Sequence, residues 1–183
     1  MIITVSGTAG SGKSTIAKNL AQSLGYERIY VGGVRRDLAK QRGMTLEEFN
    51  VWSETNPQGD VEVDEMIQKQ MVGKDNVVLE GRVMHHFFPQ AFKIYVTCDP
   101  AVAAQRVYGD ISSGGRPEEG VQTLESITQG IITREASDAL RYKQYYNLNV
   151  HDLSAYDLVL DTTQLTPQEA LSQTLKALPQ TLD

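Results

Sequence analysis

Residues 7–15 of the chain are Gly7-Thr8-Ala9-Gly10-Ser11-Gly12-Lys13-Ser14-Thr15. This stretch matches the pattern G-x-x-x-x-G-K-[ST] at every defined position, and it lies between an apolar run, Ile2–Ser6, and an amphipathic stretch, Ser14–Leu24. Glycines let consecutive backbone N–H groups turn inward around a phosphate, and the following helix adds the positive end of its dipole. A turn that only connects a strand to a helix needs neither a lysine nor a hydroxyl at these positions. The stretch therefore predicts a phosphate-binding loop in an α/β fold.

Two side chains of this loop predict how it binds a nucleotide. Lys13 is expected to reach the β- and γ-phosphates of ATP. The hydroxyl of Ser14 is expected to bind Mg²⁺, whose other ligands are phosphate oxygens, water and a carboxylate. The strings typical of a GTPase, D-x-x-G and N-K-x-D, do not occur in the chain. A small-molecule kinase is therefore the favoured interpretation, and a regulatory or assembly ATPase that acts without an acceptor is the alternative.

Composition and charge limit the partners of the chain. Its 183 residues suggest one domain, residues 1–183, and 40% hydrophobic with 22% charged residues is typical of globular proteins. The 17 Lys and Arg against 23 Asp and Glu give a net charge of −6, which offers no basic field for nucleic acid or an anionic membrane. The single cysteine, Cys98, fits a reducing compartment, and no apolar run is long enough to span a membrane. We expect a cytoplasmic monomer whose partners are small nucleotides.

Short apolar runs alternate with longer amphipathic stretches, which is the pattern of strand–helix units in a parallel sheet. The expected strands are Ile2–Ser6, Ile29–Val31, Asn76–Glu80, Phe92–Cys98 and Tyr156–Leu160. The expected helices are Ser14–Leu24, Val34–Arg42 after a Gly32-Gly33 turn, one that starts at a Thr45 capping box, one from Asp60 to Val72, Ala101–Tyr108, Leu124–Tyr146 and one that starts at a Thr166 capping box. Residues 109–120 lose this periodicity and predict a flexible loop.

Two arginines on the expected long helix are candidates for binding phosphate. Arg134 and Arg141 are seven residues apart, which is about 20° from eclipsed on a helix, so they project from one face two turns apart. Arginine offers planar, always charged donors that suit a phosphate. The alternative is an ion-pair ladder with Asp138, which lies about one turn from both.

Further charged residues lie at expected ends of strands and starts of helices. Glu80 and Arg82 follow an apolar strand and are expected at the carboxyl edge of the sheet, where ligands bind in open α/β folds. Glu80 is a candidate ligand of Mg²⁺ and Arg82 a candidate for gripping an acceptor phosphate; a polar exit turn is the alternative. Arg35 and Arg36, at the start of a helix, oppose the helix dipole unless an anion is bound.

The chain resembles the short, archaeal-type cytidylate kinases over nearly its whole length. The motifs that carry the resemblance are the phosphate-binding loop, Gly32-Gly33-Val34-Arg35-Arg36, residues 42–50, 78–82, Arg134-Glu135, Arg141-Tyr142-Lys143 and residues 152–159. The resemblance implies a P-loop three-layer α/β fold with a five-stranded parallel sheet, an acceptor-binding helical region near residues 33–72 and a lid near residues 107–122. It implies that the γ-phosphoryl group of ATP passes to CMP or dCMP, with UMP, AMP or a small metabolite as alternative acceptors.

The resemblance also implies roles for single residues. The expected catalytic residues are Lys13, Arg116, Arg134 and Arg141, the expected substrate-binding residues are Arg36, Arg82 and Arg106, and the expected metal ligands are Ser14 and Glu80. By position, Arg106 and Arg116 would be on the lid side. One departure stands out, because the family often has an acid where this chain has Gly33. We therefore expect Gly33 to weaken contacts with the acceptor.

Overall fold

A parallel sheet forms the centre of the computed structural model, which describes residues 1–113 and 122–179. Its strands are β1 (Ile2–Gly7), β2 (Glu27–Tyr30), β3 (Val77–Glu80), β4 (Phe92–Thr97) and β5 (Leu158–Asp161). Their order is β2-β3-β1-β4-β5, and every neighbouring pair is parallel. The carboxyl ends of the strands therefore meet at one edge, with β1 at its centre. The predicted α/β fold with a five-stranded parallel sheet is confirmed in the described residues.

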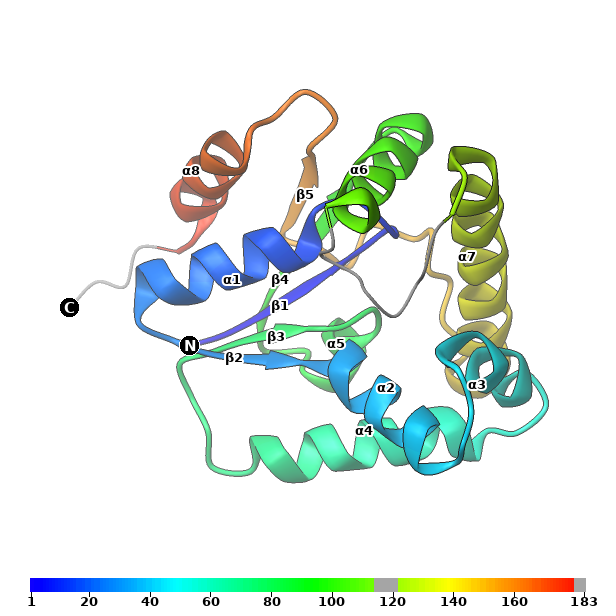
Figure 1. The fold of residues 1–183 in the computed structure, drawn as a ribbon. Coiled ribbons are helices and arrows are strands. Elements are labelled where there is room, and N and C mark those ends of the chain that lie inside the picture. The colour runs from blue at the N-terminus through cyan, green and yellow to red at the C-terminus, as the bar shows by residue number, and fades with distance from the viewer. Residues whose placement is uncertain (114–121, 180–183) are drawn as a thin grey trace.

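Helices cover both faces of the sheet. They are α1 (Lys13–Leu24), α2 (Val31–Gln41), α3 (Leu46–Ser53), α4 (Gln58–Met71), α5 (Met84–Phe87), α6 (Pro100–Ser112), α7 (Leu124–Tyr146) and α8 (Pro167–Ala177). Figure 1 shows α1 and α8 over one face, α4 over the opposite face, and α7 beside the carboxyl edge of the sheet. This arrangement leaves the carboxyl edge between α1 and α7 as the place where a ligand can meet both.

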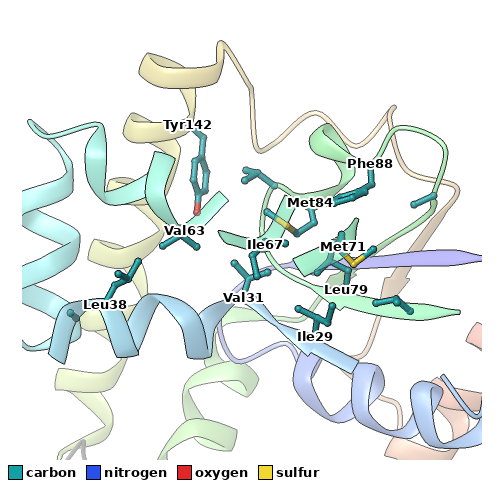
Figure 2. Close-up of a cluster of buried hydrophobic side chains, with 14 of the residues drawn as sticks. Ile29, Val31, Leu38, Val63, Ile67, Met71, Leu79, Met84, Phe88 and Tyr142 are labelled. Atoms are coloured by element: carbon teal, nitrogen blue, oxygen red, sulfur yellow. The ribbon is translucent and has the colours of Figure 1, made fainter. Parts of the chain in front are cut away.

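Two apolar clusters hold these layers together. On one face, Leu20 of α1 is buried with Val5 and Val78 of the strands. On the other face, α2, α4 and α5 are buried against β2 and β3, and Figure 2 shows Tyr142 of α7 pointing toward Val63 of α4. The contact fixes α7, which carries the candidate arginines, against the helical region. Among the described helices, none is both long enough and apolar enough to cross a membrane.

Local sequence signals predicted several helix ends correctly. The hydroxyl of Thr45 accepts the N–H of Glu48 at 3.1 Å, and the Glu48 carboxylate in turn accepts the N–H of Thr45, so the predicted capping box is present. The second predicted capping box, at Thr166, is also present at the start of α8. Helix α7 has the predicted bounds, Leu124–Tyr146.

Four local predictions are wrong. Gly32 and Gly33 do not form a turn, because α2 begins at Val31 and neither glycine has a positive φ. The helix expected from Asp60 begins earlier, at Gln58, and the Asp60 carboxylate is buried in ion pairs with two arginines. Residues 109–112 are not a loop but the end of α6, where Ile111 packs against a buried cluster shared with α7. The last strand begins at Leu158 rather than Tyr156.

The predicted acceptor-binding region and lid fall on different parts of this fold. Residues 33–72 comprise most of α2 together with α3 and α4. Residues 107–112 of the predicted lid belong to α6, whereas residues 114–121, with Arg116, lie outside the described residues. Both assignments stay predictions.

Candidate active site

The phosphate-binding loop joins β1 to α1 at the centre of the carboxyl edge. Gly7 has a φ of 141°, and a Cβ there would lie 1.9 Å from the carbonyl oxygen of Val96 on β4, so the close approach of these strands requires glycine. Gly12, with a φ of 85°, is the N-cap of α1, and Lys13 is the first helical residue. The first-turn N–H groups of α1 lack carbonyl partners within the helix, as at any helix start, and therefore suit an anion.

Lys13 lies folded over the loop that it follows. Its Nζ donates to the carbonyl oxygen of Thr8 at 2.5 Å. Burial, and then the charges of Arg82 and Arg134, lower the pKa of Lys13 to about 7. A bound phosphate would favour the charged form again, because an opposite charge raises the pKa of an amine. The protonation of Lys13 is therefore expected to change when a nucleotide binds.

Ser14 and Glu80 meet beside this lysine. The Ser14 Oγ donates to Glu80 Oε1 at 2.6 Å, and Glu80 is buried. Arg28 donates to the other oxygen, Oε2, from Nε at 3.0 Å and from Nη2 at 2.5 Å. No group of three His, Cys, Asp or Glu residues in the described part of the chain could hold a metal by itself. The Ser14–Glu80 pair nevertheless fits Mg²⁺, which in nucleotide sites takes one or two protein oxygens and otherwise phosphate and water.

A buried charge chain runs from this edge of the sheet into the helical region through Arg82, Asp138, Arg141, Asp60 and Arg35. Arg82 Nε lies 2.6 Å from Asp138 Oδ2, and Arg35 Nη1 lies 3.0 Å from Asp60 Oδ1. Between them, the guanidinium of Arg141 pairs with both carboxylates and is 0% exposed. The ion pair with Asp138 that the sequence left as an alternative for Arg141 is therefore formed in this structure.

Arg134 differs from Arg141 in its surroundings. Burial, and then the charge of Arg82, lower the pKa of Arg134, and Arg36 contributes in the same direction. Burial alone would raise the pKa of Asp138, but the cations Arg82, Arg134 and Arg141 outweigh it, and that pKa lies below its usual value. Asp138 thus stays ionised among several cations. The remaining like-charge repulsion between Arg82 and Arg134 would be relieved by an anion between them.

A small cavity opens beside the loop at this point. Its lining includes Gly7, Thr8, Arg82, Tyr95, Glu135 and Tyr156. The Glu135 Oε1 accepts the N–H of Ala9 in the loop at 2.8 Å, so a carboxylate lies against a loop N–H group. The buried Oγ1 of Thr8 has no hydrogen-bond partner among the described residues. The loop and Arg82 therefore line one cavity.

The two adjacent arginines of α2 have separate environments. Arg36 Nη1 donates to the hydroxyl of Tyr30 at 2.6 Å. Arg35 instead donates to Asn50 Oδ1 at 2.8 Å and to Ser53 Oγ at 3.0 Å, both on α3. Arg35 thus connects α2 to α3 and, through the buried charge chain, to α4. Only Arg36 of the pair stays a candidate for the acceptor.

Arg106 lies behind the loop rather than across it. Its Nη1 donates to Thr162 Oγ1 at 3.0 Å and its Nη2 to the Thr162 carbonyl oxygen at 2.8 Å. The Thr162 hydroxyl in turn donates to the carbonyl oxygen of Ser11 at 2.8 Å. Arg106 therefore supports the loop through Thr162. Arg116, which was expected near it on the lid, lies outside the described residues.

Several residues at this edge were not identified from the sequence, namely Arg28, Tyr30, Glu135, Tyr156 and Thr162. Glu135 contacts a residue 126 positions away and Thr162 one that is 151 positions away. No local motif marks such pairs. Only the parallel order of the strands, which collects their carboxyl ends, could have suggested Tyr30 and Thr162.

Comparison with known proteins identifies relatives over nearly the whole chain. Residues 3–124 match the family described as AAA domain. A cytidylate kinase from Methanococcoides burtonii is 38% identical over 164 residues, which covers 90% of this chain and 89% of that protein. A cytidylate kinase from Haloarcula marismortui is 39% identical over 181 residues, which covers 97% of this chain and 88% of that protein.

Solved structures with the same fold are more distant in sequence. A shikimate kinase from Bacteroides thetaiotaomicron has a TM-score of 0.61 at 15% identity and covers 96% of this chain and 97% of its own. A gluconokinase from Sinorhizobium meliloti has a TM-score of 0.57 at 14% identity, with 96% and 89% covered. These two likenesses concern the fold alone.

Proposed function

Because this chain belongs to the cytidylate kinase family, we propose that it transfers the γ-phosphoryl group of ATP to CMP or dCMP, giving ADP and CDP or dCDP. One structural observation supports the proposal above others: Arg82, the arginine that follows β3, lines the same cavity as the loop residues Gly7 and Thr8. A donor phosphate on the loop and an acceptor phosphate on Arg82 would therefore be neighbours.

The reaction that we propose requires no general base. The acceptor is a phosphate monoester, whose second pKa near 6 leaves it mostly dianionic at neutral pH and already nucleophilic. One of its oxygens attacks the γ-phosphorus of ATP as the bond to the β-phosphate oxygen breaks, and ADP leaves. The main obstacle is repulsion between two polyanions. The protein's contribution is therefore positioning and preorganised positive charge.

In our proposal, different residues around the loop bind the donor phosphates, bind the acceptor phosphate and stabilise the group that is transferred. The loop, Gly7 to Thr15, holds the donor phosphates, and Lys13 reaches the β- and γ-phosphates. Arg82 and Arg36 bind the acceptor phosphate. Arg134, which the charge of Arg82 repels, stabilises the phosphoryl group during transfer.

The remaining arginines have supporting parts in the same proposal. Arg141 acts through Asp138, which it holds in place against Arg82, because its guanidinium is buried between two carboxylates. Arg106 supports the loop from behind, through Thr162. Arg116, a lid-side residue by the resemblance, lies outside the described residues, and its catalytic role stays a prediction. Closure over the site would exclude water and protect ATP from hydrolysis.

Mg²⁺ fits the same arrangement. Ser14 Oγ and Glu80 Oε1, 2.6 Å apart, are the protein oxygens that would hold it, directly or through water. When bound with ATP, the ion neutralises charge that develops on the phosphate oxygens. Arg28 orients Glu80 through its two hydrogen bonds to Oε2.

An acceptor panel tests the proposal. CMP, dCMP, UMP, AMP and shikimate are each offered with ATP and Mg²⁺, and ADP formation is followed in a coupled assay. CMP and dCMP should give the highest kcat/KM. Preference for UMP, AMP or shikimate would reassign the acceptor, and ATP consumption that no acceptor stimulates would favour the ATPase alternative.

Location and assembly complete the proposal. We place the protein in the cytoplasm, where ATP and nucleoside monophosphates are available, and the buried free thiol of Cys98 is compatible with that reducing compartment. We also propose a monomer, which light scattering on the purified protein tests directly.

A further inference from the structure

Tyr30, the last residue of β2, lies between two arginines. Arg28, also on β2, has its Cζ 5.2 Å from the centroid of the Tyr30 ring. Arg36, on α2, has its Cζ 5.7 Å from the same centroid. The Tyr30 hydroxyl accepts the hydrogen bond from Arg36 Nη1 at 2.6 Å. Contacts of a cation with a ring face and with a phenol oxygen both restrict the guanidinium. Tyr30 therefore contacts Arg36 in two ways, at its ring and at its hydroxyl.

Two glycines make room for this ring. A Cβ on Gly32 would lie 2.8 Å from Tyr30 Cε2 and 2.9 Å from Cζ and Oη, closer than side chains tolerate. A Cβ on Gly33 would lie 3.3 Å from Tyr30 Cδ1, which is also tight. Both glycines are helical with negative φ, so backbone freedom does not explain them. The ring's close approach does explain Gly32, and it leaves little room for a side chain at Gly33.

The same tyrosine is linked to the opposite side of the site. In the parallel register Tyr30 is paired with Glu80, and Arg28, two residues earlier on β2, projects from the same face as Tyr30. Arg28 contacts the Tyr30 ring and binds Glu80, whose other oxygen accepts from Ser14. A continuous line of contacts thus joins Ser14, at the donor side, to Arg36.

We propose that Tyr30 is a positioning residue for the acceptor, which holds Arg36 toward the acceptor phosphate, and that Gly32 and Gly33 serve to admit its ring. The assignment rests on the proposed function, in which Arg36 binds the phosphate of CMP. Tyr30 itself does not touch the phosphate.

The test compares Tyr30→Phe with a matched control, Tyr26→Phe. Tyr26 precedes the same strand but packs against the cluster on the α1 face. Tyr30→Phe keeps the ring and removes the oxygen that accepts from Arg36, so we expect the KM for CMP to rise about tenfold while the KM for ATP changes by less than about twofold. Tyr26→Phe should leave both constants unchanged. A KM for CMP within about twofold of the wild type in Tyr30→Phe would overturn the proposal.

A second pair of variants tests whether Gly32 makes room for the Tyr30 ring. Gly32→Ala should displace the ring and raise the KM for CMP as Tyr30→Phe does, whereas in a Tyr30→Ala background the same change should add nothing, because the ring is gone. Equal effects of Gly32→Ala in both backgrounds would refute the role given to Gly32. Thermal unfolding of every variant, and titration of CMP without ATP, separate lost binding from lost folding.

Failure of this inference is distinguishable from failure of the proposed function. If the wild-type protein does not phosphorylate CMP, the proposed function fails. If it does, and Tyr30→Phe retains the wild-type KM for CMP, only the role of Tyr30 fails.

Discussion

Replacing Arg141 by leucine tests the buried charge chain that links the candidate site to the helical region. Arg141 has no exposed surface, and its guanidinium pairs with Asp60 and Asp138. After the change each carboxylate keeps one ion pair among the described residues, with Arg35 at 3.0 Å from Asp60 and with Arg82 at 2.6 Å from Asp138. Both stay buried, with one positive charge fewer between them.

The expected cost follows from that burial. Breaking a buried ion pair by removing one partner costs about 3–5 kcal/mol, because a charge is left uncompensated. The two remaining arginines place this case at the lower end, about 3 kcal/mol. With a urea slope of about 2–3 kcal/mol/M, the midpoint of unfolding should fall by about 1–1.5 M.

The chain contains its own probe for this measurement. Trp52, the single tryptophan, lies on α3, where its ring is stacked on Phe49 with centroids 5.7 Å apart. Its fluorescence should therefore follow unfolding of the helical region in urea. The control is Lys69→Ala, which removes an ion pair with Glu65 whose side chains are 77% and 59% exposed. Such an exposed pair contributes less than about 1 kcal/mol.

A stable Arg141→Leu variant that no longer binds nucleotide would place Arg141 at a phosphate. If Arg141→Leu unfolds within about 1 kcal/mol of the wild type while CMP or ATP binding is lost, Arg141 contributes little to the fold and contacts a phosphate instead. That outcome would support the expectation from the sequence that Arg141, like Arg134, binds phosphate. Loss of stability with a shared decline in both nucleotide affinities fits the buried charge chain.

Three further predictions concern named groups. Lys13→Ala should lower phosphoryl transfer at least about 10²-fold in the coupled assay, and near wild-type turnover would exclude its role. Since the pKa of free Lys13 is about 7, ATP binding at pH 8 should take up about one proton, measured by calorimetry in buffers of different ionisation enthalpy; zero uptake would contradict this. Burial raises the pKa of Asp64 from 3.8 to about 7. Between pH 3.8 and pH 7 the native state therefore keeps a proton on Asp64 that the unfolded state has lost, so the stability of the wild type falls as the pH rises through this window. Asp64→Asn should remove about 2–3 kcal/mol of that fall between pH 5 and 8, and an unchanged pH profile would argue against a buried neutral Asp64.

What the sequence predicted well depends on short-range rules. The phosphate-binding loop is a contiguous pattern, and the Thr45 and Thr166 capping boxes need only four residues each. Helix α7 has its predicted bounds, and in the structure Thr123 caps its start, which is again a local contact. Such elements are specified by neighbours in the chain, so they are visible without a structure.

What the sequence did not predict depends on residues far apart. Aspartate is a residue type common at helix starts, yet the carboxylate of Asp60 pairs with Arg35 and Arg141, which lie 25 and 81 positions away in the chain. A glycine pair is typical of a turn, yet Gly32 and Gly33 lie in a helix, where a Cβ on either would meet the ring of Tyr30. Tertiary contacts override local preference at these positions. They are also the positions that form and support the candidate site.

The most direct test of the account follows the phosphoryl group itself. ATP labelled with ³²P at the γ-position is mixed with CMP, Mg²⁺ and the purified protein, and the nucleotides are separated. If the protein transfers the γ-phosphoryl group to CMP, label leaves ATP and appears in CDP, with one ADP formed per CDP. Label that appears in inorganic phosphate, at a rate that CMP does not change, would contradict it.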